Sequence, residues 1–216
     1  MAEETGLIVP LGDWVLATAL RELSLWDGDF RIAINLSPSQ IRAPGLLPGL
    51  AAALAKSAID PGRLEFEVTE HILLNDTETS LAALQRLREM GASIALDDFG
   101  TGYSSLAYLR RFPFDRIKID RSFVTDLETS ESSRAIVCAI TQLAEALAMK
   151  TTAEGVESAG QLDLLRELGC DEAQGYLIRT PQPAARLTTA RRRGETEVLD
   201  YRKARVSSMK RSGQAG

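Results

Sequence analysis

Hydrophobic and polar positions alternate along this chain in a way that predicts strands and helices following one another. Short stretches with period-two alternation predict strands, and apolar residues spaced three and four apart predict the helices between them. The expected strands are residues 31–36, 63–70, 93–97, 116–120, 150–154 and 172–177. A first helix opens at Pro10, with Leu11, Trp14, Val15, Thr18 and Ala19 on one face. Alternation of this kind favours parallel strands joined by helical crossovers.

The two faces of these strands differ in chemistry. One face is apolar and is expected to lie under the helices, as Ile32/Ile34 and Leu64/Phe66 illustrate. The opposite face carries polar side chains near the strand ends: Asn35, Glu65, Glu67, Asp97, Lys118, Asp120, Glu154, Gln174 and Tyr176. An open doubly wound sheet would be apolar on both faces, so the pattern favours a TIM-like (β/α)8 barrel with its site at the carboxyl ends of the strands.

The number of strands indicates an incomplete barrel. About six of the eight strands are expected here, and the fold typically needs about 250 residues, whereas this chain has 216. Because the C-terminus runs into a polar tail, we expect the two missing strands to lie upstream. The predicted domains are 1–185, a barrel domain without its N-terminal strands, and 186–216, a short helix and a basic polar tail.

Composition and charge narrow the class of protein. The chain is 44% hydrophobic with a net charge of −5, and residues 186–216 contain nine Lys or Arg against three Asp or Glu. Residues 1–185 therefore carry −11, which disfavours binding to polymeric nucleic acid and suits a carboxylate metal site. Two cysteines, Cys138 and Cys170, indicate buried thiols, and a single histidine, His71, is expected at the surface. No signal peptide or membrane span is expected, so the sequence predicts a cytoplasmic protein.

The stretch from Asp97 to Ser105 is the centre of the candidate chemistry. Two adjacent carboxylates, Asp97 and Asp98, follow a buried strand and precede a loop with two glycines and two serines. Neighbouring residues of a regular strand point to opposite faces. Either the strand ends there and both carboxylates turn toward one divalent metal ion, or Asp98 caps the next helix and Asp97 is solvated.

Six ordered motifs together resemble the EAL domain family. They are Asn35-Leu36-Ser37, Glu67-Val68-Thr69-Glu70, Asp97–Ser105, Lys118-Ile119-Asp120, Ala153–Glu157 and Gln174-Gly175-Tyr176-Leu177. The resemblance runs from about Ala2 to Pro183. It implies a bacterial phosphodiesterase that hydrolyses cyclic di-GMP to linear pGpG with two Mg²⁺ or Mn²⁺ ions.

The resemblance also implies roles for individual residues. Asn35, Glu67, Asp97, Asp98 and Glu154 would be metal ligands. Lys118 would hold the attacking water or a phosphate oxygen, Glu154 would be a ligand or general base, and Gln174 would assist them. Glu70 and Glu157 would brace the loop after Asp98. Expected partners are cyclic di-GMP, a second copy in a homodimer, and fused or coupled sensory or GGDEF domains.

Other interpretations stay open at this stage. The family's strand-borne Glu-Ala-Leu, whose Glu is a metal ligand, is expected upstream of Ala2, so the chain by itself is expected to be a poor enzyme. A catalytically inactive EAL module that binds cyclic di-GMP or a protein partner is the alternative. A barrel aldolase would use Lys118 as a Schiff-base nucleophile, but nearby carboxylates favour the charged amine. Structurally, Asn35 could be a strand-end turn residue, and Lys118 could simply neutralise Asp120.

Overall fold

The structure, a computed structural model, describes residues 2–26, 28, 30–73, 77–101, 109, 112 and 114–184. The side chains of His71, Leu73 and Thr77 lie outside this description, as do most of the expected helix near Leu106 and Leu109, the last helix and the tail. The chain divides into two compact units, Met1–Ile117 (the N-terminal unit) and Lys118–Gly216 (the C-terminal unit). The expected division at residue 185 remains a prediction.

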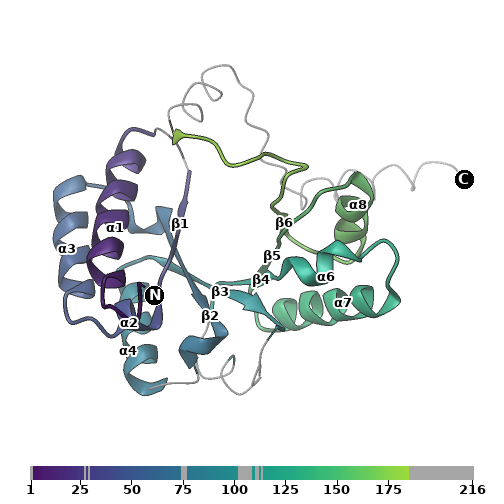
Figure 1. Ribbon diagram of the computed structural model, residues 1–216, viewed down its shortest axis with the longest axis horizontal. Coiled ribbons are helices and arrows are strands. Elements are labelled where there is room, and N and C mark those ends of the chain that lie inside the picture. Colours follow the sequence, from purple (N-terminus) through teal and green to yellow (C-terminus); the bar gives the residue numbers. More distant parts are fainter. Residues whose placement is uncertain are drawn as a thin grey trace, which may run out of the picture. The chain divides into compact units, whose positions relative to one another are not determined.

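All six expected strands are present (Figure 1). They are β1 (Ile32–Asn35), β2 (Leu64–Thr69), β3 (Ser93–Phe99), β4 (Arg116–Ile119), β5 (Lys150–Ala153) and β6 (Glu172–Ala173). Their order in the sheet is the order of the sequence, and β1–β2, β2–β3 and β5–β6 pair in parallel. Only β6 is much shorter than expected, because regular strand geometry ends before Gln174.

The alternation of apolar and polar residues in β2 and β3 separates an apolar face from a polar face. Phe66 lies opposite Ile94 in the register, and both are fully buried, as is Leu64. Glu65 and Glu67 lie at the intervening positions of β2 and are each 8% exposed. The face under the helices is therefore apolar, as the sequence predicted, and the opposite face holds carboxylates that are also largely removed from water.

Helices of the N-terminal unit cover the apolar face of the first strands (Figure 1). They are α1 (Ile8–Ser24), α2 (Pro38–Ile41), α3 (Leu46–Ser57) and α4 (Thr77–Glu89), with short 3₁₀ turns at Pro61–Arg63 and Glu70–Leu73. A capping box starts α2, where Ser37 Oγ accepts from the Gln40 N–H and the Gln40 side chain accepts from the Ser37 N–H.

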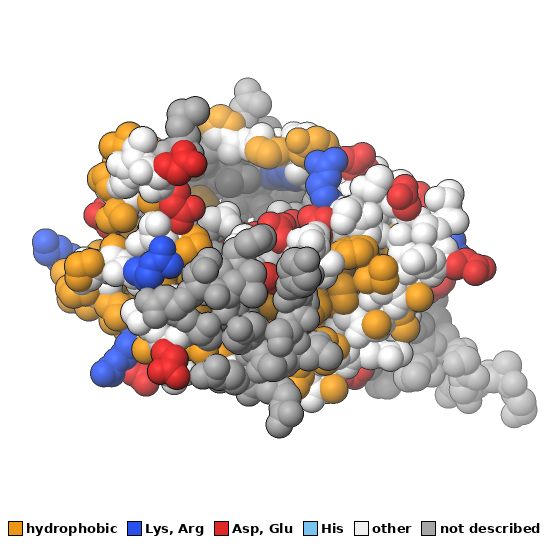
Figure 2. Space-filling model, turned by 60° about the horizontal axis from the view of Figure 1, so that its bottom comes forward, with side chains coloured by type: hydrophobic (Ala, Val, Ile, Leu, Met, Phe, Trp, Pro, Cys, Tyr) orange, Lys and Arg blue, Asp and Glu red, His pale blue; other side chains and the backbone are white. Residues whose placement is uncertain are grey.

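The buried face of α1 differs from the face that the sequence suggested. Leu16, Leu20 and Leu23 are buried, and α1 contacts α3 and β1. Leu11 and Trp14 are 48% and 64% exposed, and hydrophobic side chains are visible at the molecular surface (Figure 2). Both faces of α1 carry large apolar residues, so periodicity alone could not show which one packs against the sheet.

The C-terminal unit contains α6 (Arg121–Thr125), α7 (Glu131–Ala146) and α8 (Ala159–Glu167). Ser130 Oγ caps α7 by accepting from the Ser133 N–H, and Ser158 forms a capping box with Gln161 at the start of α8. Val137 and Ile140 of α7 are buried, whereas Ile136 is 37% exposed. Within the described residues, none of the helices combines the length and hydropathy needed to cross a membrane.

The two cysteines have different environments. Cys170 is 6% exposed, and burial raises the pKa of its thiol despite a hydrogen bond involving Thr151. Cys138 is only partly buried, and its sulfur accepts a hydrogen bond from Gln142 on the same helix. Both thiols are free, so the expectation of two unpaired cysteines is confirmed, but full burial of Cys138 is wrong.

The C-terminus of α7 suggests a stabilising substitution. Ala148 has a left-handed backbone (φ +57°), with its N–H bonded to the Glu145 carbonyl and the Met149 N–H bonded to the Ala144 carbonyl. Glycine is favoured in this Schellman motif because it has no Cβ to clash. Ala148→Gly is therefore expected to raise the free energy of unfolding by about 0.5–1 kcal/mol. Urea denaturation would measure it.

The matched control is Ala139→Gly, the same change at an exposed position inside α7. There, glycine is expected to lower the free energy of unfolding by about 1 kcal/mol, because it loses more backbone entropy in a helix than alanine does. The same sign for both variants would contradict the assignment of strain to Ala148.

Candidate metal and phosphodiester site

The candidate residues fall into two clusters, one in each unit. The first cluster comprises Asn35, Glu67, Glu70, Asp97 and Asp98 of the N-terminal unit. The second comprises Lys118, Glu154 and Gln174 of the C-terminal unit. Each cluster lies at or just after the carboxyl ends of its strands. This is the edge of a parallel sheet at which barrel enzymes hold their reacting groups.

In the first cluster, Asn35 and Glu67 are brought together by the strand register. They are direct partners across β1 and β2, and the Leu36 N–H donates to the Glu67 carbonyl over 2.9 Å. Asn35 is exposed, whereas Glu67 is 8% exposed. The side chain of Asn35 therefore remains accessible to solvent, while the Glu67 carboxylate is held in the polar interior face.

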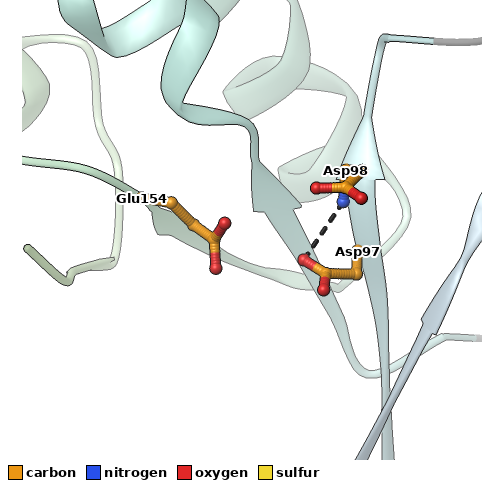
Figure 3. Close-up of side chains that lie close together, drawn as sticks. All are labelled: Asp97, Asp98 and Glu154. Carbon is orange, nitrogen blue, oxygen red and sulfur yellow. Dashed lines mark hydrogen bonds between the residues drawn. The ribbon is translucent and has the colours of Figure 1, made fainter. Parts of the chain in front are cut away.

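The backbone at Asp98 bears on the question that the sequence left open. Asp98 has a left-handed conformation (φ +53°), so strand geometry is interrupted at that residue. Its N–H donates to Asp97 Oδ1 over 3.1 Å, and both carboxylates project on the same side of β3 (Figure 3). Asp97 is only 8% exposed, so the alternative of a solvated Asp97 is wrong.

Glu70 holds the start of the loop that follows β3. Its Oε1 accepts a hydrogen bond from the Gly100 N–H over 2.8 Å, and the residue is 8% exposed. Gly100 itself has a positive φ of 95°, where a glycine is unstrained. This contact supports the bracing role expected for Glu70, although residues 102–108 of the loop lie outside the described residues.

Glu157, the other expected brace, is placed differently. Its side chain is exposed, and its backbone N–H donates to Gln161 Oε1 over 2.7 Å at the start of α8. No hydrogen bond from its side chain occurs within the described part of the chain. The predicted contact of Glu157 with the loop therefore stays a prediction.

In the second cluster, Glu154 is the common partner. Lys118 Nζ lies 2.7 Å from Glu154 Oε1, and Gln174 Nε2 donates to the same oxygen over 3.4 Å. The side chain of Lys118 is 6% exposed and that of Glu154 is 19% exposed. A carboxylate this close favours the ammonium form of Lys118, which disfavours the Schiff-base chemistry of an aldolase.

Backbone contacts fix the spacing in this cluster. The Glu154 N–H donates to the Ile119 carbonyl, and the Gln174 N–H donates to the Ala153 carbonyl over 2.8 Å. A Cβ on Gly175 would lie only 2.2 Å from backbone atoms of Val156, so this close approach requires glycine. Gln174 is thereby kept within reach of Glu154 although β6 has already ended.

Asp120, considered as a neutralising partner of Lys118, caps a helix. Its Oδ1 accepts from the Ser122 N–H over 2.9 Å at the start of α6. Burial would raise its pKa, but the hydrogen bonds from Ser122 outweigh burial and hold the pKa below the ordinary value. The Lys118 ammonium is instead in contact with Glu154.

The donor atoms of these residues fit a hard divalent cation. Asn35, Glu67, Asp97, Asp98 and Glu154 offer only carboxylate and amide oxygens, which Mg²⁺ and Mn²⁺ prefer. The only Glu-Ala-Leu of the chain, Glu145–Leu147, overlaps the end of α7, and Glu145 is exposed there. That tripeptide lies on a helix and is not a strand-borne metal ligand.

Sequence reasoning missed one ionic contact on the same polar face. Arg116 Nε donates to Glu65 Oε2 over 3.0 Å, and both residues are buried. Glu65 stood out as an inward-facing polar residue, but the partner on β4 did not. Arg116 could have been placed on the polar face from the sequence, because it is two residues before Lys118 and side chains two apart on a strand point to the same face.

The EAL domain family model matches residues 1–181. The chain belongs to the EAL domain family. The protein MucR of Pseudomonas aeruginosa, named a bifunctional diguanylate cyclase/cyclic di-GMP phosphodiesterase, is 46% identical over 191 residues, which cover 87% of this chain and 28% of MucR. This chain spans only 22% and 28% of the length of the first two curated relatives that it matches, so both relatives are much longer proteins.

Solved EAL structures share the fold. A structure described as the MucR phosphodiesterase in complex with c-di-GMP has a TM-score of 0.82 and 45% identity, covering 86% of this chain and 77% of that one. The EAL domain of Mycobacterium smegmatis DcpA has a TM-score of 0.83 and 36% identity, covering 88% of both chains. Klebsiella pneumoniae BlrP1, in a manganese/c-di-GMP complex, has a TM-score of 0.71 and 33% identity, covering 78% of this chain and 43% of its own.

These similarities confirm two predictions made from the sequence. The family is the EAL family, and the fold class is mixed α/β with the parallel strands of an incomplete TIM-like barrel.

Proposed function

We propose that this EAL domain hydrolyses cyclic di-GMP to linear pGpG in bacterial second-messenger signalling. The observation that carries the proposal is the Lys118–Glu154–Gln174 contact at the ends of successive strands, in a chain 45% identical to a phosphodiesterase bound to c-di-GMP. A lysine and a carboxylate in contact can bind a phosphate oxygen and accept a proton from water. These are the two tasks that phosphodiester hydrolysis requires of the protein.

We propose further that two Mg²⁺ or Mn²⁺ ions bind to Asn35, Glu67, Asp97, Asp98 and Glu154. Asp97 and Asp98, whose carboxylates project on the same side of β3 (Figure 3), are the two adjacent acidic residues that we assign to this centre. The oxygen-only donor set supports it, as does the manganese complex of BlrP1. When bound, such cations stabilise charge on the phosphate and lower the pKa of a coordinated water.

The chain's own residues would then divide the reaction between them. The Lys118 ammonium would hold a phosphate oxygen or the attacking water. Glu154 would accept a proton from that water as the water oxygen bonds to phosphorus, and would return it to the ribose oxygen as the bond from phosphorus to that oxygen breaks. Gln174 orients Glu154 through its hydrogen bond, while Glu70 and Glu157 hold the loop after Asp98. Each role extends a contact described above, except that of Glu157.

The test is an assay of the full-length gene product with cyclic di-GMP and either Mn²⁺ or Mg²⁺, with chromatographic detection of linear pGpG. We expect product with either ion and none after chelation. Absence of product with both ions would contradict the proposal.

A second candidate is an EAL module that binds cyclic di-GMP or a protein partner without turnover. It is favoured by one observation, namely that residues 1–216 contain no strand-borne Glu-Ala-Leu. Calorimetry with cyclic di-GMP separates the two candidates, because binding without turnover would support the module. The name of MucR suggests coupling to a GGDEF-type cyclase domain, and we include this coupling, sensory domains, a homodimer and a cytoplasmic location in the proposal.

A further inference from the structure

A buried ion pair joins two strands that are not neighbours in the sheet. Glu65 lies on β2 and Arg116 on β4, and β3 lies between them in the strand order. Arg116 Nε is 3.0 Å from Glu65 Oε2, and the two side chains are 7% and 11% exposed. The pair therefore spans two strand spacings, about 10 Å, on the polar face of the sheet.

Ser93 occupies the position under this bridge. It is the register partner of Glu65 on β3, and its Oγ lies 3.4 Å from Glu65 Oε2 and 3.2 Å from the Leu64 carbonyl. A small hydroxyl side chain leaves room for Glu65 and Arg116 to meet above β3. The three residues form a polar layer, which we call the floor layer.

The floor layer lies on the same side of the strands as the proposed metal ligands. Side chains alternate along a strand, so Glu67 shares a face with Glu65, and Asp97 shares a face with Ser93. Glu67 is two residues beyond Glu65, and Asp97 is four residues beyond Ser93. The strands that carry two proposed ligands are thus tied together one layer below Glu67 and two layers below Asp97.

We propose that Glu65 and Arg116 are positioning residues, which tie β2 to β4 across β3 and so hold β2 and β3 in the arrangement that lets Glu67 and Asp97 bind a divalent cation together. The inference rests on the proposed metal site. A buried ion pair gives little or no net stability compared with well-packed apolar side chains, because both charges are desolvated. Its directional contact can instead fix the geometry of the strands that carry it.

The experiment compares variants that keep the net charge of the chain unchanged. The double variant Glu65→Leu/Arg116→Met removes the directional contact but fills the space with apolar groups. The exchanged variant Glu65→Arg/Arg116→Glu restores an ion pair in the opposite sense. Mn²⁺ affinity is measured without substrate, from the electron paramagnetic resonance of free Mn²⁺, and thermal unfolding is recorded for each protein.

A matched control comes from a second Arg–carboxylate pair in the same unit. Arg88 and Asp115 form two hydrogen bonds, of 2.9 and 3.2 Å, and Asp115 also accepts from the Ile94 N–H at the start of β3. Their side chains are 30% and 32% exposed, and Arg88 belongs to α4. Arg88→Met/Asp115→Leu therefore removes a strand contact outside the floor layer, again without a change in net charge.

We expect Glu65→Leu/Arg116→Met to bind Mn²⁺ about tenfold more weakly, the low end of the effects seen when groups supporting metal ligands are lost. The exchanged variant recovers much of that affinity, and the control variant loses thermal stability but keeps wild-type Mn²⁺ affinity. In the turnover assay, we expect Glu65→Leu/Arg116→Met to lower kcat at saturating cyclic di-GMP without a matching rise in KM.

Wild-type Mn²⁺ affinity in Glu65→Leu/Arg116→Met, or an equal loss in the control variant, would overturn the inference. If Glu65→Leu/Arg116→Met fails to fold by circular dichroism, Glu65→Gln/Arg116→Gln replaces it under the same criteria. A wild-type protein that binds Mn²⁺ but does not hydrolyse cyclic di-GMP would refute the proposed function alone, because the affinity comparison needs no turnover.

Discussion

Asp97→Asn is expected to reduce kcat for cyclic di-GMP hydrolysis by about 10³-fold, while the affinity for cyclic di-GMP changes much less. Asp97 is 8% exposed, and its Oδ1 already accepts the Asp98 N–H. An asparagine keeps the size of the side chain and one oxygen, but removes the charge that a metal ligand provides. Loss of about 4 kcal/mol of transition-state stabilisation corresponds to that factor. Single-turnover kinetics and calorimetry with cyclic di-GMP would measure both quantities.

The control for this prediction is Asp13→Asn, the same change at an exposed position of α1. It is expected to leave kcat, KM and stability unchanged. Turnover by Asp97→Asn within tenfold of the wild type would show that Asp97 is not an essential ligand.

Lys118→Ala is expected to lower kcat by at least about 10²-fold and to destabilise the fold. The ammonium lies 2.7 Å from Glu154 Oε1 and is almost fully buried, so its loss leaves a carboxylate without this partner. Removing one member of a buried pair typically costs about 3–5 kcal/mol of stability. The loss of kcat can be separated from the loss of stability by measuring kcat at temperatures where circular dichroism shows the variant to be folded.

Lys150→Ala, at the exposed first residue of β5, is the matched control and should change neither stability nor kcat. Lys118→Arg adds a second comparison, because it retains the positive charge with a different shape. Near-wild-type kcat in folded Lys118→Ala would refute the role of Lys118 in catalysis, and trapping of a carbonyl substrate on Lys118 by borohydride would favour the aldolase alternative instead.

The strands and their polar faces were predictable from sequence because period-two alternation has a direct physical cause. A strand with one face under helices must place apolar residues at every second position, as Leu64, Phe66 and Val68 do in β2. The observed bounds of β1 to β5 lie within two residues of those expected. Most residues of both clusters were found for the same reason, since polar groups at strand ends stand out against that alternation, whereas the role of Glu70 came from the family resemblance.

Other features depend on contacts that local patterns do not encode. The pattern of residues 172–177 predicts a strand of that length, but β6 ends at Ala173 and the chain turns after it, where Gly175 lies against the Val156 backbone. The Glu65–Arg116 contact joins residues 51 positions apart, so no local window contains both. The left-handed conformation of Asp98 is likewise a property of the folded chain, because aspartate adopts it only where the surroundings require it.

That backbone conformation narrows the set of amino acids that residue 98 can tolerate. Glycine, asparagine and aspartate are the residues that most readily adopt a left-handed conformation, and aspartate alone among them is anionic. The proposed ligand role adds a requirement for negative charge to the requirement of the backbone, and among these three residues aspartate alone meets both. Among relatives that hydrolyse cyclic di-GMP, we expect almost no substitution of this aspartate. Relatives that have lost metal binding should replace it first with asparagine or glycine. If the proposed ligand role is right, the identity of residue 98 should separate EAL enzymes from EAL binding modules.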